Sequence, residues 1–292
     1  MTRPAAVAGT FYPADPVELA TLIDAMLDAA PPARTPVSTK PPGTSGGAPS
    51  DPTPSTQTMV TTTSVDGLVA YIVPHAGYQF SGPTAAHVYR ELRDRPAPFE
   101  RAVVLGPAHH VPLRGAAVST ATAWATPLGE IAIDTDRARL LVDRGLAVAD
   151  DRPHAPEHSI EVQVPLLLRV HLPKLLPVLI GPDDPDAVAA LLDAVAGPGT
   201  VVLCSTDLSH YLTEEEARRR DAATAAAIDD LAPERIGAGD ACGRHALRGL
   251  LTWGRRHALR VDRLALATSA DTGGPRDRVV GYPAVRLSRA PY

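Results

Sequence analysis

Aromatic residues are scarce in this sequence of 292 residues. Phe, Trp and Tyr make up 4% of the chain, although 45% of its residues are hydrophobic. The core must therefore consist mainly of Val, Leu, Ala and Ile side chains. The length is sufficient for one large domain or two small ones, and we expect a single domain over residues 1–292.

Long hydrophobic runs, a strong charge imbalance and frequent cysteines are also absent. No run of 18 apolar residues occurs, so we expect no membrane-spanning helix. The net charge of −5 does not favour nucleic acid as a partner. The stretch MTRPAAVAGTFYPADP lacks the apolar region of a signal peptide. With only Cys204 and Cys242 present, we expect a cytoplasmic protein with free thiols, although the two could form one disulfide.

A segment rich in Pro, Ser, Thr and Gly occupies residues 31–66. Its composition cannot bury enough apolar surface to offset the entropy of ordering, which predicts disorder. Because a predicted helix precedes it and a predicted strand follows, we interpret it as an insert within the domain.

Outside this insert, short apolar segments alternate with amphipathic ones. The amphipathic spacing predicts helices over 16–30, 82–94, 184–197, 213–231 and 244–259. The Val- and Leu-rich runs predict strands over 67–75, 101–110, 175–182, 200–210 and 277–287. Such alternation is typical of an α/β layered sandwich, in which helices cover a central sheet that is largely parallel or mixed.

Three of the predicted strands end in a polar cluster that contains histidine. The clusters are PHAG at 74–77, where the strand at 67–75 ends, GPAHH within 101–110 and STDLSH within 200–210. In α/β sheets, ligand sites gather beyond the carboxyl ends of the strands. The histidines are therefore predicted to converge on one pocket.

His75 and His109 are the first candidate metal ligands, because two neutral imidazoles from separate strands could hold a divalent ion. His110 could be a further ligand or could orient one. The alternative is that each histidine bonds a nearby carbonyl and only ends its strand.

Asp207 and His210 form a candidate acid–base pair, because a carboxylate beside an imidazole can orient it and raise its basicity. The alternative for Asp207 is a turn in which it bonds backbone amides.

Cys242 precedes a predicted helix, where backbone amides lower a thiol pKa and where Arg244 and His245 could help. A thiolate there would be a metal ligand or a nucleophile. The alternative is an inert small residue, which is our interpretation of Cys204 inside its apolar strand.

The segment HAPEHSIEVQVPLLL contains His158 and Glu161, which are three residues apart and would share a helix face. We interpret it as a pocket wall and a helix start, with Ser159 as an N-cap candidate. A di-metal site is disfavoured because no second copy of the motif occurs.

Taken together, these motifs resemble the Memo family, also named AmmeMemoRadiSam system protein B in bacteria. The resemblance runs through AGTFYPADP, VPHAGYQFSG, LGPAHHVPL, ATPLGEIAID, EHSIEVQVPLL, STDLSHY and ACGRHALRGLL. It spans nearly the whole chain except the insert.

The resemblance implies a fold similar to that of class III extradiol dioxygenases, which use non-haem Fe(II). By motif, His75, His109 and Cys242 would bind the metal, while Asp207 and His210 would line the pocket and His210 would handle protons. A Cys replaces the carboxylate of the dioxygenases, and this donor set suits Cu(I) or Zn(II) at least as well as Fe(II).

The main hypothesis is therefore a mononuclear iron- or copper-dependent oxidoreductase with an unknown substrate. Supporting or pocket positions are expected for His110, His245, His158 and Glu161. Two alternatives stay open, a module that binds a peptide or partner protein and a zinc hydrolase in which His210 is the base. The family's bacterial name also implies a radical SAM protein as a pathway partner.

Overall fold

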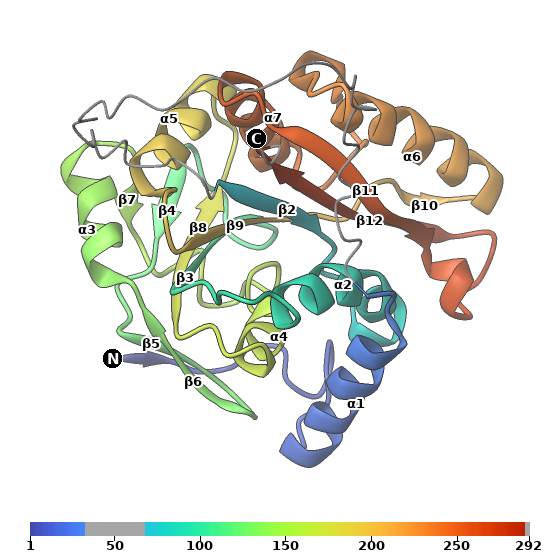
Figure 1. The fold of residues 1–292 in the computed structure, drawn as a ribbon, viewed down its shortest axis with the longest axis horizontal. Coiled ribbons are helices and arrows are strands. Elements are labelled where there is room, and N and C mark those ends of the chain that lie inside the picture. Colours follow the sequence, from blue (N-terminus) through green and yellow to red (C-terminus); the bar gives the residue numbers. More distant parts are fainter. Residues whose placement is uncertain (33–67, 290–292) are drawn as a thin grey trace, which may run out of the picture.

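A computed structural model of the chain describes residues 1–32 and 68–289. The insert predicted over 31–66 lies almost entirely outside the described residues. Within them, twelve strands form one mixed sheet that is packed between helices (Figure 1).

The helices are α1 (Pro16–Ala29), α2 (Tyr78–Arg93), α3 (Thr135–Asp143), α4 (Gln163–Arg169), α5 (Pro185–Val195), α6 (Glu214–Asp229) and α7 (Arg244–Arg256). The strands are β1 (Thr2–Arg3), β2 (Val69–Val73), β3 (Arg101–Pro107), β4 (Ala116–Val118), β5 (Ala123–Thr126), β6 (Gly129–Ile133), β7 (Val148–Ala149), β8 (Lys174–Ile180), β9 (Thr200–Ser205), β10 (His210–Leu212), β11 (Arg260–Thr268) and β12 (Val279–Ser288).

The centre of the sheet is parallel, in the order β8-β3-β9-β2. The C-terminal part of the chain adds β12 antiparallel to β2, and both β11 and β10 pair with β12 in an antiparallel sense. The expectation of an α/β architecture with a mixed, helix-covered sheet is thus confirmed.

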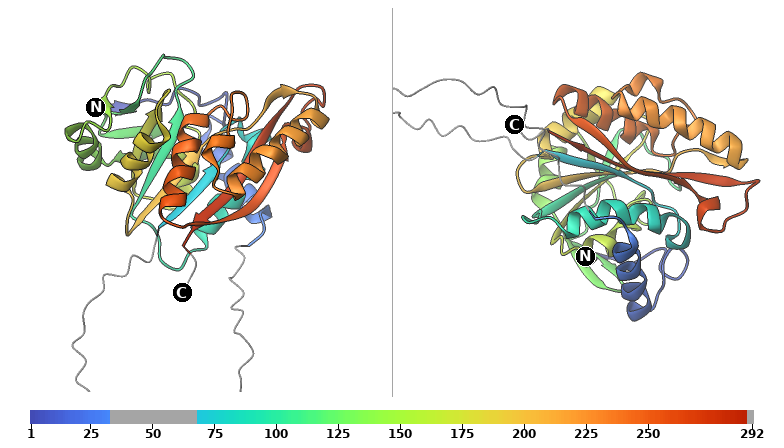
Figure 2. Two further views of the ribbon diagram at one scale, coloured as in Figure 1. Left: turned by 90° about the horizontal axis from the view of Figure 1, so that it is seen from above. Right: turned by 45° about the vertical axis from the view of Figure 1, so that its right-hand side comes forward.

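Alternation along the central strands produces two hydrophobic cores, one on each face of the sheet. In β2, Val69, Tyr71 and Val73 join the core under α1, α2 and α4. The residues between them, Ala70 and Ile72, join the core under α5 and α7. Figure 2 shows the two helical layers on opposite sides of the sheet. Because the central strands are buried on both faces, they read as continuous apolar runs in the sequence.

All five predicted strands and all five predicted helices are present, with ends that differ by a few residues. The helix expected around His158 and Ser159 is wrong at its start, because residues 159–162 form turns and α4 begins at Gln163. Ser159 is not its N-cap, since its hydroxyl donates to the Pro107 carbonyl at 2.8 Å.

The parallel strands β2, β3 and β9 end at one edge of the sheet. Val73 is in register with Ser205, and Cys204 is in register with Leu105. The loop before α7 packs against the same edge, because the Cys242 amide donates to the Asp207 carbonyl at 3.2 Å. This edge therefore brings together residues from four distant parts of the chain.

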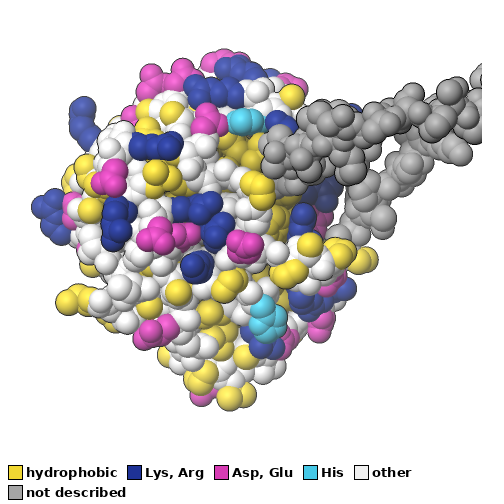
Figure 3. Space-filling model, turned by 60° about the vertical axis from the view of Figure 1, so that its left-hand side comes forward, with side chains coloured by type: hydrophobic (Ala, Val, Ile, Leu, Met, Phe, Trp, Pro, Cys, Tyr) yellow, Lys and Arg dark blue, Asp and Glu magenta, His cyan; other side chains and the backbone are white. Residues whose placement is uncertain are grey.

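The outer surface carries charges of both signs. Figure 3 shows basic and acidic side chains interspersed over the face that contains α3, without a large area of one sign. No helix among the described residues combines the length and apolar character that a membrane span requires.

Candidate metal centre

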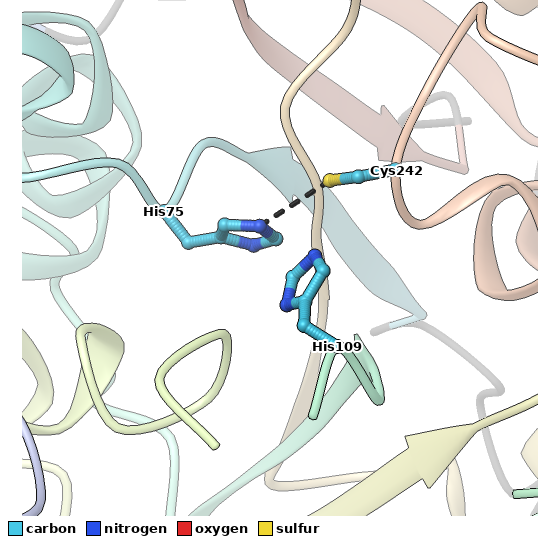
Figure 4. A group of neighbouring side chains, drawn as sticks. All are labelled: His75, His109 and Cys242. Carbon is cyan, nitrogen blue, oxygen red and sulfur yellow. Dashed lines mark hydrogen bonds between the residues drawn. The ribbon is translucent and has the colours of Figure 1, made fainter. Parts of the chain in front are cut away.

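His75, His109 and Cys242 form a compact group at the edge where the central strands end. Each offers one ligand atom, and these atoms lie within 4.8 Å of one another. His75 follows β2, His109 follows β3, and Cys242 lies two residues before α7 (Figure 4). Both imidazoles and the sulfur point into the same space.

His75 is the buried member of the group, with 1% of its surface exposed. Its Nε2 lies 3.3 Å from the Cys242 sulfur and its Nδ1 lies 3.0 Å from the Ser205 hydroxyl. Its backbone amide donates to Asp207 Oδ1 at 2.8 Å. Burial lowers the pKa of His75 well below its ordinary value, so the imidazole is neutral, as a metal ligand must be.

His109 is oriented by a buried carboxylate. Glu157 Oε1 lies 2.9 Å from His109 Nδ1, and the other oxygen accepts from the His109 backbone amide. Although burial alone would raise the pKa of Glu157, its hydrogen bonds from the His109 ring and from backbone amides hold this pKa well below the usual range. An ionised carboxylate only accepts, so His109 carries a proton on Nδ1 and its Nε2 is free. A carboxylate behind a histidine is the usual support of a metal ligand.

Glu157 is itself held in place by backbone amides. The amides of His158 and Ser159 each donate to its Oε1 at 2.9 Å, and its side chain is 1% exposed. Glu157 also belongs to a second group, with His109 and His158, that could hold an ion. Because its oxygens already accept these bonds, we regard Glu157 as the support of His109.

Cys242 lies beside Asp207, whose backbone amide is 3.3 Å from the sulfur. Burial and the Asp207 charge raise the pKa of the Cys242 thiol to about 12. The expectation of a lowered thiol pKa is therefore wrong for the metal-free protein, because desolvation outweighs the amides at the start of α7. A bound metal ion would deprotonate a coordinating thiol.

Asp207 and His210 do not form the expected pair. Asp207 accepts from the His75 amide, and burial raises its carboxyl pKa to about 7. His210 Nδ1 lies 2.8 Å from the Leu208 carbonyl. Since a carbonyl only accepts, His210 carries its proton on Nδ1 and its Nε2 is the free nitrogen. The turn after β9 thus makes Asp207 a support of the main chain at His75.

Four residues, His110, His158, His245 and Glu161, were expected from sequence to support the site or line its pocket. Of these, His158 contacts the candidate metal ligands directly. Its ring stacks on His109 with a centroid distance of 4.7 Å and meets the His75 ring edge-on at 5.4 Å. The His110 ring is farther out, with its centroid 6.5 Å from that of His109. His245 accepts from Arg244 Nε at 3.2 Å.

Glu161 belongs to a different environment. Its carboxylate binds Arg3 at 2.6 Å and accepts from the Tyr12 hydroxyl at 2.7 Å. It therefore connects the N-terminal segment to the loop that carries Glu157.

The sequence interpretation missed two residues that contact the histidines, Glu157 and Ser205. Glu157 was visible as a carboxylate next to His158, but helical spacing directed attention to Glu161. Ser205 had no signal of its own, because serine at a strand end is common. A groove of about 620 Å³ lies elsewhere, and its lining includes Arg114, Val148 and Asp183 but none of the metal-ligand candidates.

Comparison with known proteins agrees with the sequence motifs. The profile of a family described as Memo-like protein matches residues 3–286. A MEMO1 family protein of Methanopyrus kandleri is 35% identical in an alignment that covers 99% of this chain and all of the relative. One from Desulfurococcus amylolyticus is 32% identical and covers 96% of this chain and 97% of the relative. One from Aeropyrum pernix is 35% identical in an alignment that covers 75% of this chain and 83% of the relative.

Fold and site together define an α/β protein with a candidate metal centre of two histidines and one cysteine at the ends of parallel strands. The chain belongs to the Memo family, as its motifs indicated.

Proposed function

We propose that this protein is a mononuclear metal-dependent oxidoreductase whose metal ion, iron or copper, is held by His75, His109 and Cys242. The observation that carries the proposal is the convergence of these three donors, from three distant segments, within 4.8 Å of one another. We also propose that the fold is of the class III extradiol dioxygenase type, on the strength of the family resemblance.

The donor chemistry fits a transition metal. Two neutral imidazoles and one thiolate form a set that suits copper, iron or zinc, whereas Mg²⁺ and Ca²⁺ prefer oxygen ligands. Three protein ligands also leave a coordination position for substrate or oxygen. The His109 side chain is 28% exposed, so the group is reachable from the surface. When bound, iron or copper would supply electron transfer and a site for dioxygen or substrate.

The protein's own residues would orient the substrate and move protons. His210 Nε2 is free, and burial lowers the pKa of His210, so a neutral imidazole is available to accept a proton. We therefore retain His210 as the proposed proton acceptor. We assign Asp207 the task of holding the His75 backbone, in place of orienting His210.

The test is elemental analysis of anaerobically purified protein, comparing the wild type with His109→Ala and Cys242→Ala. We expect about one iron or copper per chain in the wild type and loss of metal from both variants. Cys204→Ala is the matched control and should keep its metal, because Cys204 is buried in β9.

The other outcomes decide against the proposal in different ways. Zinc alone, with turnover that needs no oxygen, would favour a zinc hydrolase. No metal under any loading condition, with tight partner binding that survives His109→Ala, would favour a binding module.

A further inference from the structure

The Ser205 hydroxyl lies at the centre of a buried polar network behind His75. Its Oγ is 3.0 Å from His75 Nδ1, 2.9 Å from Gln163 Nε2 and 2.6 Å from the Ser159 carbonyl. Ser205 and Gln163 are completely buried. Because a hydroxyl has one proton and two lone pairs, three neighbours allow only one donation and two acceptances.

Two carbonyl oxygens determine the direction of these bonds, since a carbonyl can only accept. The Ser159 carbonyl must receive the Ser205 proton. The Pro74 carbonyl, 2.9 Å from Gln163, must face the amide nitrogen of that side chain. The Tyr89 hydroxyl donates to Gln163 Oε1 at 2.8 Å and completes the amide's bonding. Gln163 therefore also donates to Ser205.

With its proton used and one lone pair filled by Gln163, Ser205 can only accept from His75. His75 Nδ1 must then carry the proton, and its Nε2 must present a lone pair toward the Cys242 sulfur, 3.3 Å away. We infer that Ser205 and Gln163 are positioning residues that set the tautomer of His75 and so prepare Nε2 to bind a metal. This inference rests on the proposed role of His75 as a ligand.

The two histidine ligands would thus be prepared by different means. An ionised carboxylate holds His109, and it enforces the Nδ1–H form by itself. A serine hydroxyl can either donate to an imidazole or accept from it, so Ser205 needs its other neighbours to determine the direction. The network through Gln163 and Tyr89 provides this, and it connects the site to α2 and α4.

The first test measures the tautomer directly, by ¹⁵N NMR of the His75 ring in the metal-free protein at pH 7. We expect the Nδ1–H form in the wild type and in Ser205→Thr, which keeps the hydroxyl. Ser205→Ala should show a mixture with the Nε2–H form. Gln163→Leu should shift the His75 tautomer ratio in the same direction but by less, because the Ser205 hydroxyl remains. Ser209→Ala, another buried serine of the same segment, is the matched control and should leave the signal unchanged.

The second test measures affinity for Zn²⁺ alone, by competition with a chelator. Ser205→Ala should weaken binding by about 10- to 100-fold, the usual effect of removing a group that supports a metal ligand. Ser205→Thr should restore it. Circular dichroism checks that each variant is folded, and Gln163→Leu decides the question if Ser205→Ala does not fold.

An Nε2–H form in the wild type, or an unchanged tautomer in both Ser205→Ala and Gln163→Leu, would overturn the inference. Failure of the proposed function looks different: no variant and no wild-type sample would bind metal, while the NMR measurement would still report the tautomer.

Discussion

Tyr211 is a single residue held in an unfavourable backbone conformation. Its φ of 60° is left-handed, and the residue is 62% exposed. The residue lies at an irregularity between β10 and β12, where the register shifts between His210 and Leu212. Such bulges redirect side chains near functional sites. Here the irregularity places the partly buried His210 and the exposed Tyr211 in different environments.

We predict that Tyr211→Gly is more stable than Tyr211→Ala by about 1 kcal/mol, because only glycine adopts this backbone conformation without strain. Urea denaturation of both variants measures the difference. Within an ordinary strand the order is reversed, so the control pair Leu212→Gly and Leu212→Ala should favour alanine. Equal stabilities at position 211 would contradict the assignment of strain.

Between elements, the buried ion pair of Arg3 and Glu161 connects the N-terminal segment to the loop before α4. Both side chains are almost fully buried, at 6% and 1% exposure. Arg3 also donates to the carbonyl of His154 and to that of Glu157, each at 2.9 Å. Arg3 lies in β1, the strand at one end of the sheet order, and it therefore fixes the loop that carries Glu157, the support of His109.

We predict that Arg3→Ala destabilises the fold by about 3 to 5 kcal/mol, because Glu161 would stay buried without its charged partner. Arg256→Ala, which removes a partly exposed ion pair with Asp186, should cost no more than about 1 kcal/mol. Chemical denaturation of the two variants beside the wild type measures both values. Similar losses for the two variants would show that Arg3 does not hold the loop.

The central strands and most of the helices were predictable from sequence. Central strands such as β2 and β9 are buried on both faces, so their apolar character is visible without knowledge of the fold. Helix α3 and the strands β1, β4, β5, β6, β7, β10 and β11 were not predicted. The first half of β11 carries Arg and Asp side chains, which hide its strand character. The other missed strands are two to five residues long and carry no periodic signal. For the same reason, the turns at 159–162 were mistaken for the start of a helix.

The candidate ligands were also visible from sequence, because each follows a strand or precedes a helix. The residues that support these ligands were not visible from sequence. Glu157, Ser205 and Gln163 act through bonds to residues that are distant in sequence, and only the folded chain brings those together. The direction of the bonds depends on carbonyl groups, which leave no trace in the residue types.

At the scale of the whole molecule, stability should depend on pH through buried histidine. Burial lowers the pKa of His154 to about 4, from an ordinary value of 6.5. Below pH 6.5 His154 is protonated in the unfolded chain but stays neutral in the folded chain. The contribution of neutral His154 to stability is therefore fully present above pH 6.5 and is lost as the pH falls toward 4.

We predict that the free energy of unfolding of the metal-free protein falls between pH 7 and pH 5, with about 2 kcal/mol of the loss due to His154. His154→Gln should remove that part of the slope and leave the part that comes from other buried histidines. Denaturation curves at the two pH values measure it, with His110→Gln as an exposed control. A slope unchanged in His154→Gln would rule out this contribution.

The supports of the two histidines lie on segments that do not include Cys242. Glu157 precedes α4, and Ser205 ends β9, whereas the sulfur comes from the loop before α7. In evolutionary terms, this separates the fixed part of the centre from its adjustable part. One substitution at position 242 would exchange a soft donor for a hard one and would shift the metal that the candidate centre prefers, while the bonds that hold both imidazoles stay as they are.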